Sequence, residues 1–373
     1  MKQRLNFKKC FASVFISYLI FTSAVFAAIS PSNLRIKSAN DNIAILAWDA
    51  ATSGSQTVSY EVYRNGSLLA TLAGNVTGYI DQTVQAQNYQ YEVYAVDASG
   101  QKSSPASTTI NLAPMGIKLR LKAFLQGAYQ ASTGEMRDDL RLQQAIPITE
   151  PYMQLGHNLQ AEVQLNPALL DVTGSDAIVD WMIFELRDKT NPSNIIRSEV
   201  ALLQKDGDLV DPQTASPVFY LSDQAAGDYY IALRHRNHLG IMTANAMSLS
   251  ATESLIDFSD ANTATWGNNA RLIDNNIALM WAGDSNHDGR LIASGPQNDV
   301  NYIISEVLLA AGNTGFNANY IYTDYNNADI SLDGNVIYIG SNNDGNITQG
   351  NVLLNPDNIS FNSNFIVEEQ LPK

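Results

Sequence analysis

The chain has 373 residues, of which 45% are apolar and only 16% are charged, so it is long enough for two or three domains that each bury a core. It holds 22 basic and 37 acidic residues, which gives a formal net charge of −15. A polyanion of this size repels phosphate groups, which disfavours nucleic-acid binding and adsorption to anionic membranes. Divalent cations suit such a surface better.

The N-terminus has the pattern of an export signal. Four basic residues and no acid precede an uncharged apolar run from Cys10 to Phe26, which is followed by Ala27 in the small-residue pattern Val25-Phe26-Ala27. We therefore predict a signal peptide over residues 1–27 and a secreted or cell-surface protein. An uncleaved membrane anchor is the alternative. Because Cys10 is the single cysteine, the mature protein would have no disulfide and no cysteine metal site.

Residues 28–113 contain short alternating segments separated by turn signals, a pattern typical of a β-sandwich. Asn65-Gly66 predicts a hairpin. The stretch resembles a fibronectin type III domain, and the residues that carry the resemblance are Trp48, Tyr60 to Gly66 and the late run Tyr89-x-Tyr91-x-Val93-x-Ala95-x-Asp97. The resemblance implies that Tyr89 closes a corner by bonding back to the backbone.

Residues 114–252 show further strand-like segments and a second hairpin signal at Asp206-Gly207, which predicts a second antiparallel β-sandwich. This region and the rest of the chain resemble a module of secreted bacterial proteins often labelled haemagglutinin-like. The resemblance rests on Leu125 to Tyr129, Met136 to Arg141, Asp176 to Trp181, Leu203 to Asp208 and Gly227 to Gly240. It implies an extracellular location and no established chemistry. Residues 253–280 are polar and Asn-rich, which predicts a linker.

Residues 281–373 contain a duplication with an offset of about 45 residues, which relates Asp284–Leu291 to Asp329–Val336. Oxygen-bearing side chains at loop positions one, three and five, a glycine at six and the carbonyl at seven can converge on one hard cation. We therefore predict that each loop binds Ca²⁺. The candidate ligands are Asp284, Asn286, Asp288 and the Arg290 carbonyl in the first copy, and Asp329, Ser331, Asp333 and the Asn335 carbonyl in the second.

The two loops resemble the duplicated calcium loops of type I dockerin modules. Position twelve, which holds the chelating carboxylate there, is Gly295 or Gly340 here, and the nearest acids are Asp299 and Asp344 at position sixteen. We take these two aspartates as further candidate ligands. Asp-rich turns followed by glycine are also good turn formers, so ordinary turns remain the alternative.

The predicted fold class is therefore mainly β: two antiparallel β-sandwiches, the first fibronectin type III-like, followed by a small calcium-loop module with short helices.

Arg234-His235-Arg236-Asn237-His238 is the densest cluster of nitrogen donors in the chain. Arginine forks match planar anions, so an acidic or sulfated sugar is one possible ligand. We favour a structural role in which the arginines pair with Asp138, Asp139, Asp180 or Glu185. The aromatic residues are candidates for sugar stacking, although aromatics in strands more often belong to the core.

The sequence contains no Gly-x-Ser-x-Gly, His-Glu-x-x-His, phosphate loop or cysteine nucleophile. We therefore predict a non-catalytic extracellular adhesion or scaffold protein that binds a glycan or a surface protein, without nucleic-acid binding or membrane insertion after signal cleavage. The alternative is an accessory component of polysaccharide degradation, in which the duplicated loops act as a dockerin that binds a partner. A hydrolase in the second sandwich stays open as a third hypothesis.

Overall fold

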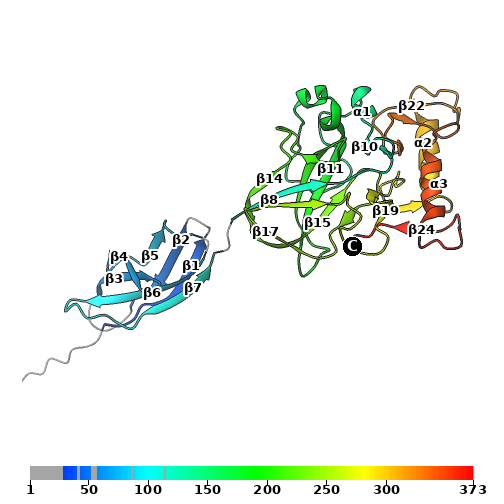
Figure 1. The fold of residues 1–373 in the computed structure, drawn as a ribbon. Coiled ribbons are helices and arrows are strands. Elements are labelled where there is room, and N and C mark those ends of the chain that lie inside the picture. The colour runs from blue at the N-terminus through cyan, green and yellow to red at the C-terminus, as the bar shows by residue number, and fades with distance from the viewer. Residues whose placement is uncertain (1–27, 40–42, 52–56, 86, 113–114, 373) are drawn as a thin grey trace, which may run out of the picture. The chain divides into compact units, whose positions relative to one another are not determined.

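The structure is a computed structural model that describes residues 28–39, 43–51, 57–85, 87–112 and 115–372 (Figure 1). The predicted signal peptide lies outside the described residues. The chain divides into two compact units, residues 1–112 and 113–373. The first unit ends at residue 112, and the fibronectin type III-like domain was predicted to end at residue 113. Among the described residues, no helix is long and apolar enough to cross a membrane.

The first unit is a sandwich of two antiparallel sheets, with strand orders β1-β2-β5 and β4-β3-β6-β7. Alternate residues of β6, from Tyr89 to Ala95, are buried and share one core with Trp48 of the opposite sheet. This arrangement confirms the predicted fibronectin type III-like sandwich. The strands are β1 (Ser32–Ala39), β2 (Ala44–Asp49), β3 (Thr57–Arg64), β4 (Ser67–Ala73), β5 (Gly78–Asp81), β6 (Asn88–Asp97) and β7 (Ala106–Asn111).

Two local predictions for this unit are confirmed. Asn65 and Gly66 have φ angles of 50° and 78°, and they connect β3 to β4 as a two-residue turn with both residues in the left-handed region. The hydroxyl of Tyr89 accepts a hydrogen bond from the backbone N–H of Gln85 at 2.8 Å. Tyr89 therefore closes the corner before β6.

Replacing Tyr89 with phenylalanine keeps the ring but removes the acceptor for the Gln85 N–H. We expect Tyr89→Phe to lower the free energy of unfolding of the first unit by about 1–2 kcal/mol. Urea denaturation followed by tryptophan fluorescence measures this loss. Tyr220→Phe, at a half-exposed side chain of the second unit, is the control and should change stability by less than about 0.5 kcal/mol. Equal effects of the two substitutions would contradict the assignment.

The second unit contains a larger sandwich. One sheet has the order β13-β12-β11-β15-β16, with β17 also paired to β15, and the other has the order β14-β8-β18. Strand β11 is buried along nearly its whole length, because it lies at the centre of the larger sheet. The strands are β8 (Met115–Lys122), β11 (Ile178–Asp188), β12 (Ile195–Gln204), β13 (Leu209–Val210), β14 (Phe219–Ala225), β15 (Gly227–Arg234), β16 (Ile241–Met242), β17 (Met247–Leu249) and β18 (Glu253–Asp257).

The predicted linker over residues 253–280 is instead part of this sandwich. Strand β18 pairs with β8, and the pair is parallel, unlike the other strand pairs described in this unit. Strands β19 (Arg271–Asp274) and β20 (Ile277–Met280) form a hairpin. Phe258, Leu279 and Met280 are buried in the main core. The asparagines that suggested a linker lie mostly in the turns between these short strands.

Short elements connect β8 to β11: β9 (Tyr129–Gln130), β10 (Glu135–Met136), α1 (Asp139–Leu142) and the 3₁₀ turns at Pro167–Asp171 and Gly174–Asp176.

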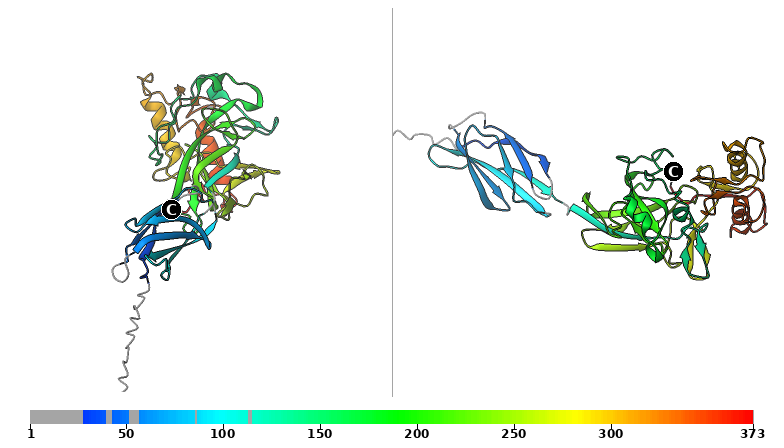
Figure 2. Two further views of the ribbon diagram at one scale, coloured as in Figure 1. Left: turned by 90° about the vertical axis from the view of Figure 1, so that its left-hand side faces the viewer. Right: turned by 90° about the horizontal axis from the view of Figure 1, so that it is seen from above.

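The duplicated region forms an interlocked pair of loop–helix units. Its elements are β21 (Arg290–Ile292), α2 (Asp299–Leu309) and β22 (Tyr322–Thr323) in the first copy, and β23 (Asn335–Val336), α3 (Asp344–Leu354) and β24 (Ile366–Glu368) in the second. Strand β21 pairs with β24, and β22 pairs with β23, so each copy completes the other. The two helices lie together on one side of the unit (Figures 1 and 2). Leu291 and Val336 are fully buried, as expected for residues that anchor the loops.

Candidate calcium loops and the adjoining pocket

The first predicted loop is closed by its own aspartate. The buried carboxylate of Asp284 accepts the backbone N–H groups of Asp288 and Gly289, each at 2.9 Å. Gly289 has a φ of +78°, which permits the sharp turn at position six. The side-chain amide of Asn286 lies 3.4 Å from a carboxylate oxygen of Asp288, so the side chains at positions three and five approach each other.

The second loop repeats this scheme 45 residues later. The carboxylate of Asp329 accepts the N–H groups of Asp333 at 3.1 Å and Gly334 at 2.8 Å. The hydroxyl of Ser331 lies 3.4 Å from Asp329 Oδ1, and Gly334 has a φ of +80°. The two loops therefore share one backbone conformation although their side chains differ.

The aspartates at position sixteen, Asp299 and Asp344, are the first residues of α2 and α3 and are fully buried. Asp299 accepts the N–H groups of Ser285 and Ile292, each at 2.8 Å. Asp344 accepts those of the equivalent Ile330 and Ile337, at 2.9 and 2.8 Å. In each copy, hydrogen bonds to this carboxylate therefore connect both the start and the end of the loop to the first residue of the helix. The spacing in the sequence placed both residues near the loops but did not reveal this backbone-binding role.

Burial disfavours the charged forms of the aspartates in and beside the loops. Burial raises the pKa of Asp299 and Asp329 to about 7 and that of Asp344 to about 8, and it raises the pKa of Asp284 well above its usual range. Across the described residues, no group of three or more His, Cys, Asp or Glu side chains could hold a metal ion. A cation in either loop would therefore need amide, hydroxyl or carbonyl oxygens beside the two carboxylates, which is the kind of donor set that Ca²⁺ accepts.

Asn237, which lies shortly after β15, forms hydrogen bonds with the backbone at the start of both loops. The carbonyl oxygen of Asn237 accepts the N–H groups of Gly283 and Asp284, at 3.0 and 3.2 Å. Its side-chain amide donates to the carbonyl oxygens of Asn327 and Asp329, at 3.0 and 2.7 Å. Residues 235–238, which directly follow β15, thus hold the entry to each loop, and we call them the docking segment.

Asp180 of β11 holds the docking segment in place. Its fully buried carboxylate lies 3.0 Å from Nε of Arg236 and 3.1 Å from Nε2 of His235, and it accepts the hydroxyl of Tyr325 at 2.7 Å. Burial alone would raise the pKa of Asp180, but Arg236 and His235 lower it to about 2. The guanidinium of Arg236 also stacks over the Tyr325 ring, 4.3 Å from its centroid.

The predicted structural role of the arginines is confirmed. Arg236 pairs with Asp180, and Arg234 pairs with Glu185 at 3.0 Å. Glu185 also binds Arg187, and Arg234 also binds Glu369 in the C-terminal segment. The network therefore ties the end of the chain to the sandwich.

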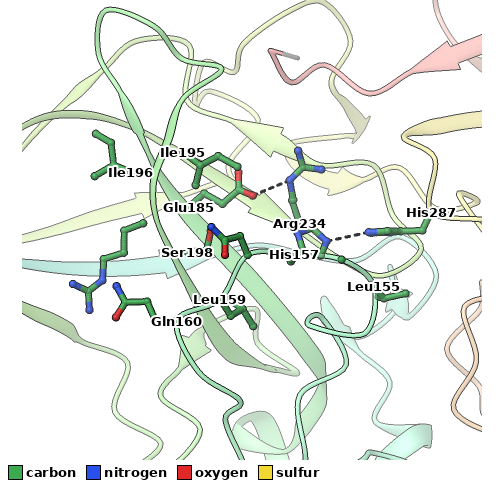
Figure 3. A pocket seen from close by; sticks show the side chains of 13 residues that line it. Leu155, His157, Leu159, Gln160, Glu185, Ile195, Ile196, Ser198, Arg234 and His287 are labelled. Carbon is green, nitrogen blue, oxygen red and sulfur yellow. Dashed lines mark hydrogen bonds and ion pairs between the residues drawn. The ribbon is translucent and has the colours of Figure 1, made fainter.

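A cavity of about 520 Å³ adjoins the first loop (Figure 3). Its lining combines exposed aliphatic side chains such as Ile195 and Ile196 with polar groups, among them His157 and His287. His287 is position four of the first loop and has a φ of 58°, and the equivalent Leu332 has the same φ but enters the main core. Burial and the neighbouring His287 lower the pKa of His157 to about 4, so its ring is neutral at neutral pH.

Comparison with known proteins shows partial similarity only. No family profile matches the chain. An α-amylase from Niallia circulans is 36% identical over 87 residues, which is 23% of this chain and 7% of the relative. The chitinase Chi52 from Paenibacillus xylanexedens is 34% identical over 82 residues, which is 22% of this chain and 15% of the relative. The chain thus spans only a small part of these carbohydrate-active enzymes.

Fibronectin type III domains are among the similar solved structures. The fibronectin(III)-like modules of Clostridium thermocellum CbhA are 16% identical, with a TM-score of 0.19, and the match covers 21% of this chain and 96% of theirs. The central fibronectin-III array of RIM-binding protein is 13% identical, with a TM-score of 0.21, and the match covers 60% of this chain and 64% of that one.

Replacing Asp180 with asparagine would leave Arg236 buried without its charge partner. We expect Asp180→Asn to lower the free energy of unfolding of the second unit by about 3–5 kcal/mol, because an uncompensated buried charge is costly. Asp228→Asn, which breaks the exposed pair with Lys189, is the matched control and should cost less than about 1 kcal/mol. Denaturant unfolding at neutral pH compares the two variants.

Measuring the stability of the unmodified chain and of Asp180→Asn at low pH tests whether the negative charge of Asp180 is responsible for the difference. Since the folded-state pKa of Asp180 lies below the usual 3.8, its contribution is present above pH 4 and is lost as the pH falls from about 4 to about 2. The gap in stability between the unmodified chain and Asp180→Asn should narrow over that range. A gap that stays constant down to pH 2 would contradict the role given to the ion pair.

Proposed function

We propose that the chain is a non-catalytic extracellular adhesion or scaffold protein whose two C-terminal loops bind Ca²⁺. The observation that supports the proposal best is the repeated loop structure, in which the first aspartate accepts the N–H groups of positions five and six in both copies. Calcium binds to the side chains at positions one, three and five and to the carbonyl at position seven. The ligands are Asp284, Asn286, Asp288 and the Arg290 carbonyl, and Asp329, Ser331, Asp333 and the Asn335 carbonyl.

The proposed sites are weak ones. Asp299 and Asp344 are outside the ligand set in this proposal, because they lie at position sixteen and their carboxylates bind the backbone at the start of the loop and at the exit from it. Each loop then has two carboxylates and no bidentate acid, and calcium affinity falls with fewer charged ligands. Such a set suits the range of about 10⁻⁴–10⁻³ M that is typical of extracellular modules.

Other observations support the proposed extracellular location and the proposed glycan or surface-protein partners. The N-terminal sequence pattern of an export signal and the similarity to an α-amylase and a chitinase support an extracellular setting rich in carbohydrate. A fibronectin type III-like unit on a chain without recognised catalytic motifs fits a scaffold that contacts a glycan or a surface protein better than it fits an independent enzyme.

Calcium should raise the thermal stability of the second unit. At 10 mM Ca²⁺ and a dissociation constant of about 10⁻⁴ M, each loop contributes about 2.7 kcal/mol, which corresponds to a rise in melting temperature of roughly 5 °C or more. The double variant Asp288→Ala, Asp333→Ala should lose most of this rise. Asp274→Ala, at the last residue of β19, is the control and should keep it. Scanning calorimetry in calcium and in chelator measures the shifts.

No calcium-dependent shift in the unmodified chain would mean that the loops are ordinary Asp-rich turns, and the calcium proposal would fail. A shift that persists in the double variant would place the calcium elsewhere.

A second candidate function is that of an accessory component of polysaccharide degradation that binds an enzyme through its repeat. The supporting observation is that exposed apolar side chains recur in both copies: Leu309 and Leu354 are 74% and 71% exposed, and Phe316 and Phe361 are 68% and 67% exposed. Aromatic and aliphatic anchors of this kind are typical of protein–protein contacts. By contrast, loop positions ten and eleven, Ala293-Ser294 and Tyr338-Ile339, differ between the copies.

If the second candidate function is right, the chain should bind a secreted polysaccharide-degrading enzyme in the presence of Ca²⁺, and the binding should saturate. The double variant Phe316→Ser, Phe361→Ser should weaken that binding at least tenfold, because it removes the two exposed aromatic anchors. Ile273→Ser, which removes an exposed apolar side chain of the sandwich, is the matched control. Surface plasmon resonance with purified secreted polysaccharide-degrading enzymes measures the affinities. Unchanged binding by the double variant would contradict this function.

A further inference from the structure

The cavity beside the first loop contains two imidazole rings that meet through their Nε2 atoms. The Nε2 atoms of His157 and His287 are 3.0 Å apart, and the ring planes are inclined at 62° (Figure 3). The two residues are 130 positions apart in the sequence, so the fold brings them together. Neither ring is needed to close the loop, which the carboxylate of Asp284 already does.

The tautomer of His287 is fixed by its other nitrogen. His287 Nδ1 lies 3.0 Å from the carbonyl oxygen of Arg236, which can only accept a hydrogen bond. Nδ1 therefore carries the proton, and in the neutral ring Nε2 presents a lone pair toward His157. Histidines that bind metals are commonly oriented in this way, by an N–H bond from the second ring nitrogen to a backbone carbonyl.

We propose that His157 and His287 form a two-histidine site for one transition-metal ion such as Zn²⁺ or Cu²⁺, with its remaining coordination positions open to the cavity. Two nitrogen ligands that each lie about 2.0–2.1 Å from one metal are separated by roughly 3 Å, which matches the observed Nε2 separation. Binding requires only that the proton of His157 shift to Nδ1, so that both Nε2 lone pairs point to the ion.

The remaining positions belong to water or to a ligand that enters the cavity. Within the described residues no third His, Cys, Asp or Glu completes a cluster, so the site is weaker than a structural zinc site. The cavity volume of about 520 Å³ leaves room for a small ligand with oxygen donors, and its wall includes Gln160 and Ser198.

The proposed two-histidine site differs from the proposed calcium loops in the type of donor atom, and it is not repeated in the second loop. Imidazole nitrogens favour zinc and copper, whereas the oxygen donors of the loops favour calcium. Position four of the second loop is Leu332, which lies in the core, so the second loop has no equivalent of this site. The proposal therefore does not depend on calcium binding by the loops.

The test uses the full-length protein without a histidine tag, in excess Ca²⁺ so that the loops are not available to the second metal. Isothermal titration with Zn²⁺ should show one site per chain with micromolar affinity. His157→Gln should weaken binding at least tenfold, whereas Ile196→Ala, at an apolar residue of the cavity wall, should leave it unchanged. Equal binding by the unmodified chain and His157→Gln, or no Zn²⁺ binding at all, would overturn the proposal.

A spectroscopic measurement on the unmodified chain does not depend on how a variant folds. With one equivalent of Cu²⁺, the electron paramagnetic resonance spectrum should show hyperfine coupling to two imidazole nitrogens. The coupling should fall to one nitrogen or disappear in His157→Gln. A copper spectrum with oxygen ligands only would overturn the proposal.

Discussion

The buried ion pair between Asp180 and Arg236 is the interaction on which the second unit depends. Both side chains are fully buried, and a charge in that position is tolerated only when it is paired. The pair fixes the docking segment, residues 235–238, where it leaves β15. Asn237 of that segment then binds the backbone at the entry to both loops. The sandwich and the duplicated repeat are therefore one structure rather than a domain with an appended module.

This dependence follows from the small size of the repeat. Its own apolar clusters contain only a few buried residues each, such as Ile303, Val307 and Val336 in one and Leu291 and Val352 in another. So little apolar surface cannot offset the conformational entropy of nearly a hundred residues. Hydrogen bonds from backbone N–H groups to buried carboxylates, contacts with the sandwich and, in our proposal, bound calcium supply the remaining stability.

Local patterns in the sequence predicted local structure well. The Asn65-Gly66 turn and the two loops are each encoded within about a dozen residues, and each has the expected conformation. The corner at Tyr89 was implied by the resemblance to fibronectin type III domains, and it is present. The pairing of Arg236 with Asp180 was among the expected options because a buried arginine needs an acid. The calcium ligands remain a prediction, since the geometry of the loops is compatible with them but does not test them.

Contacts between residues far apart in the chain could not be predicted from local sequence patterns. Strand β18 lies in a polar, Asn-rich region, and its partner β8 is more than 130 residues earlier, so nothing local distinguished it from a linker. The role of Asp299 was hidden in the same way, because its hydrogen bonds to Ser285 and Ile292 depend on how α2 packs against the loop. The approach of His157 to His287 likewise arises only when the first loop rests on the sandwich.

Because Asn237 binds the entry to both loops, we propose that calcium bound there stabilises the sandwich through the docking segment. Hydrogen exchange followed by mass spectrometry, in calcium and in chelator, tests it most directly. We expect calcium to slow exchange in peptides from β11 and β15 as well as in the loops, while peptides from β3 and β6 of the first unit are unchanged. Protection confined to the loops, or no protection anywhere, would contradict it.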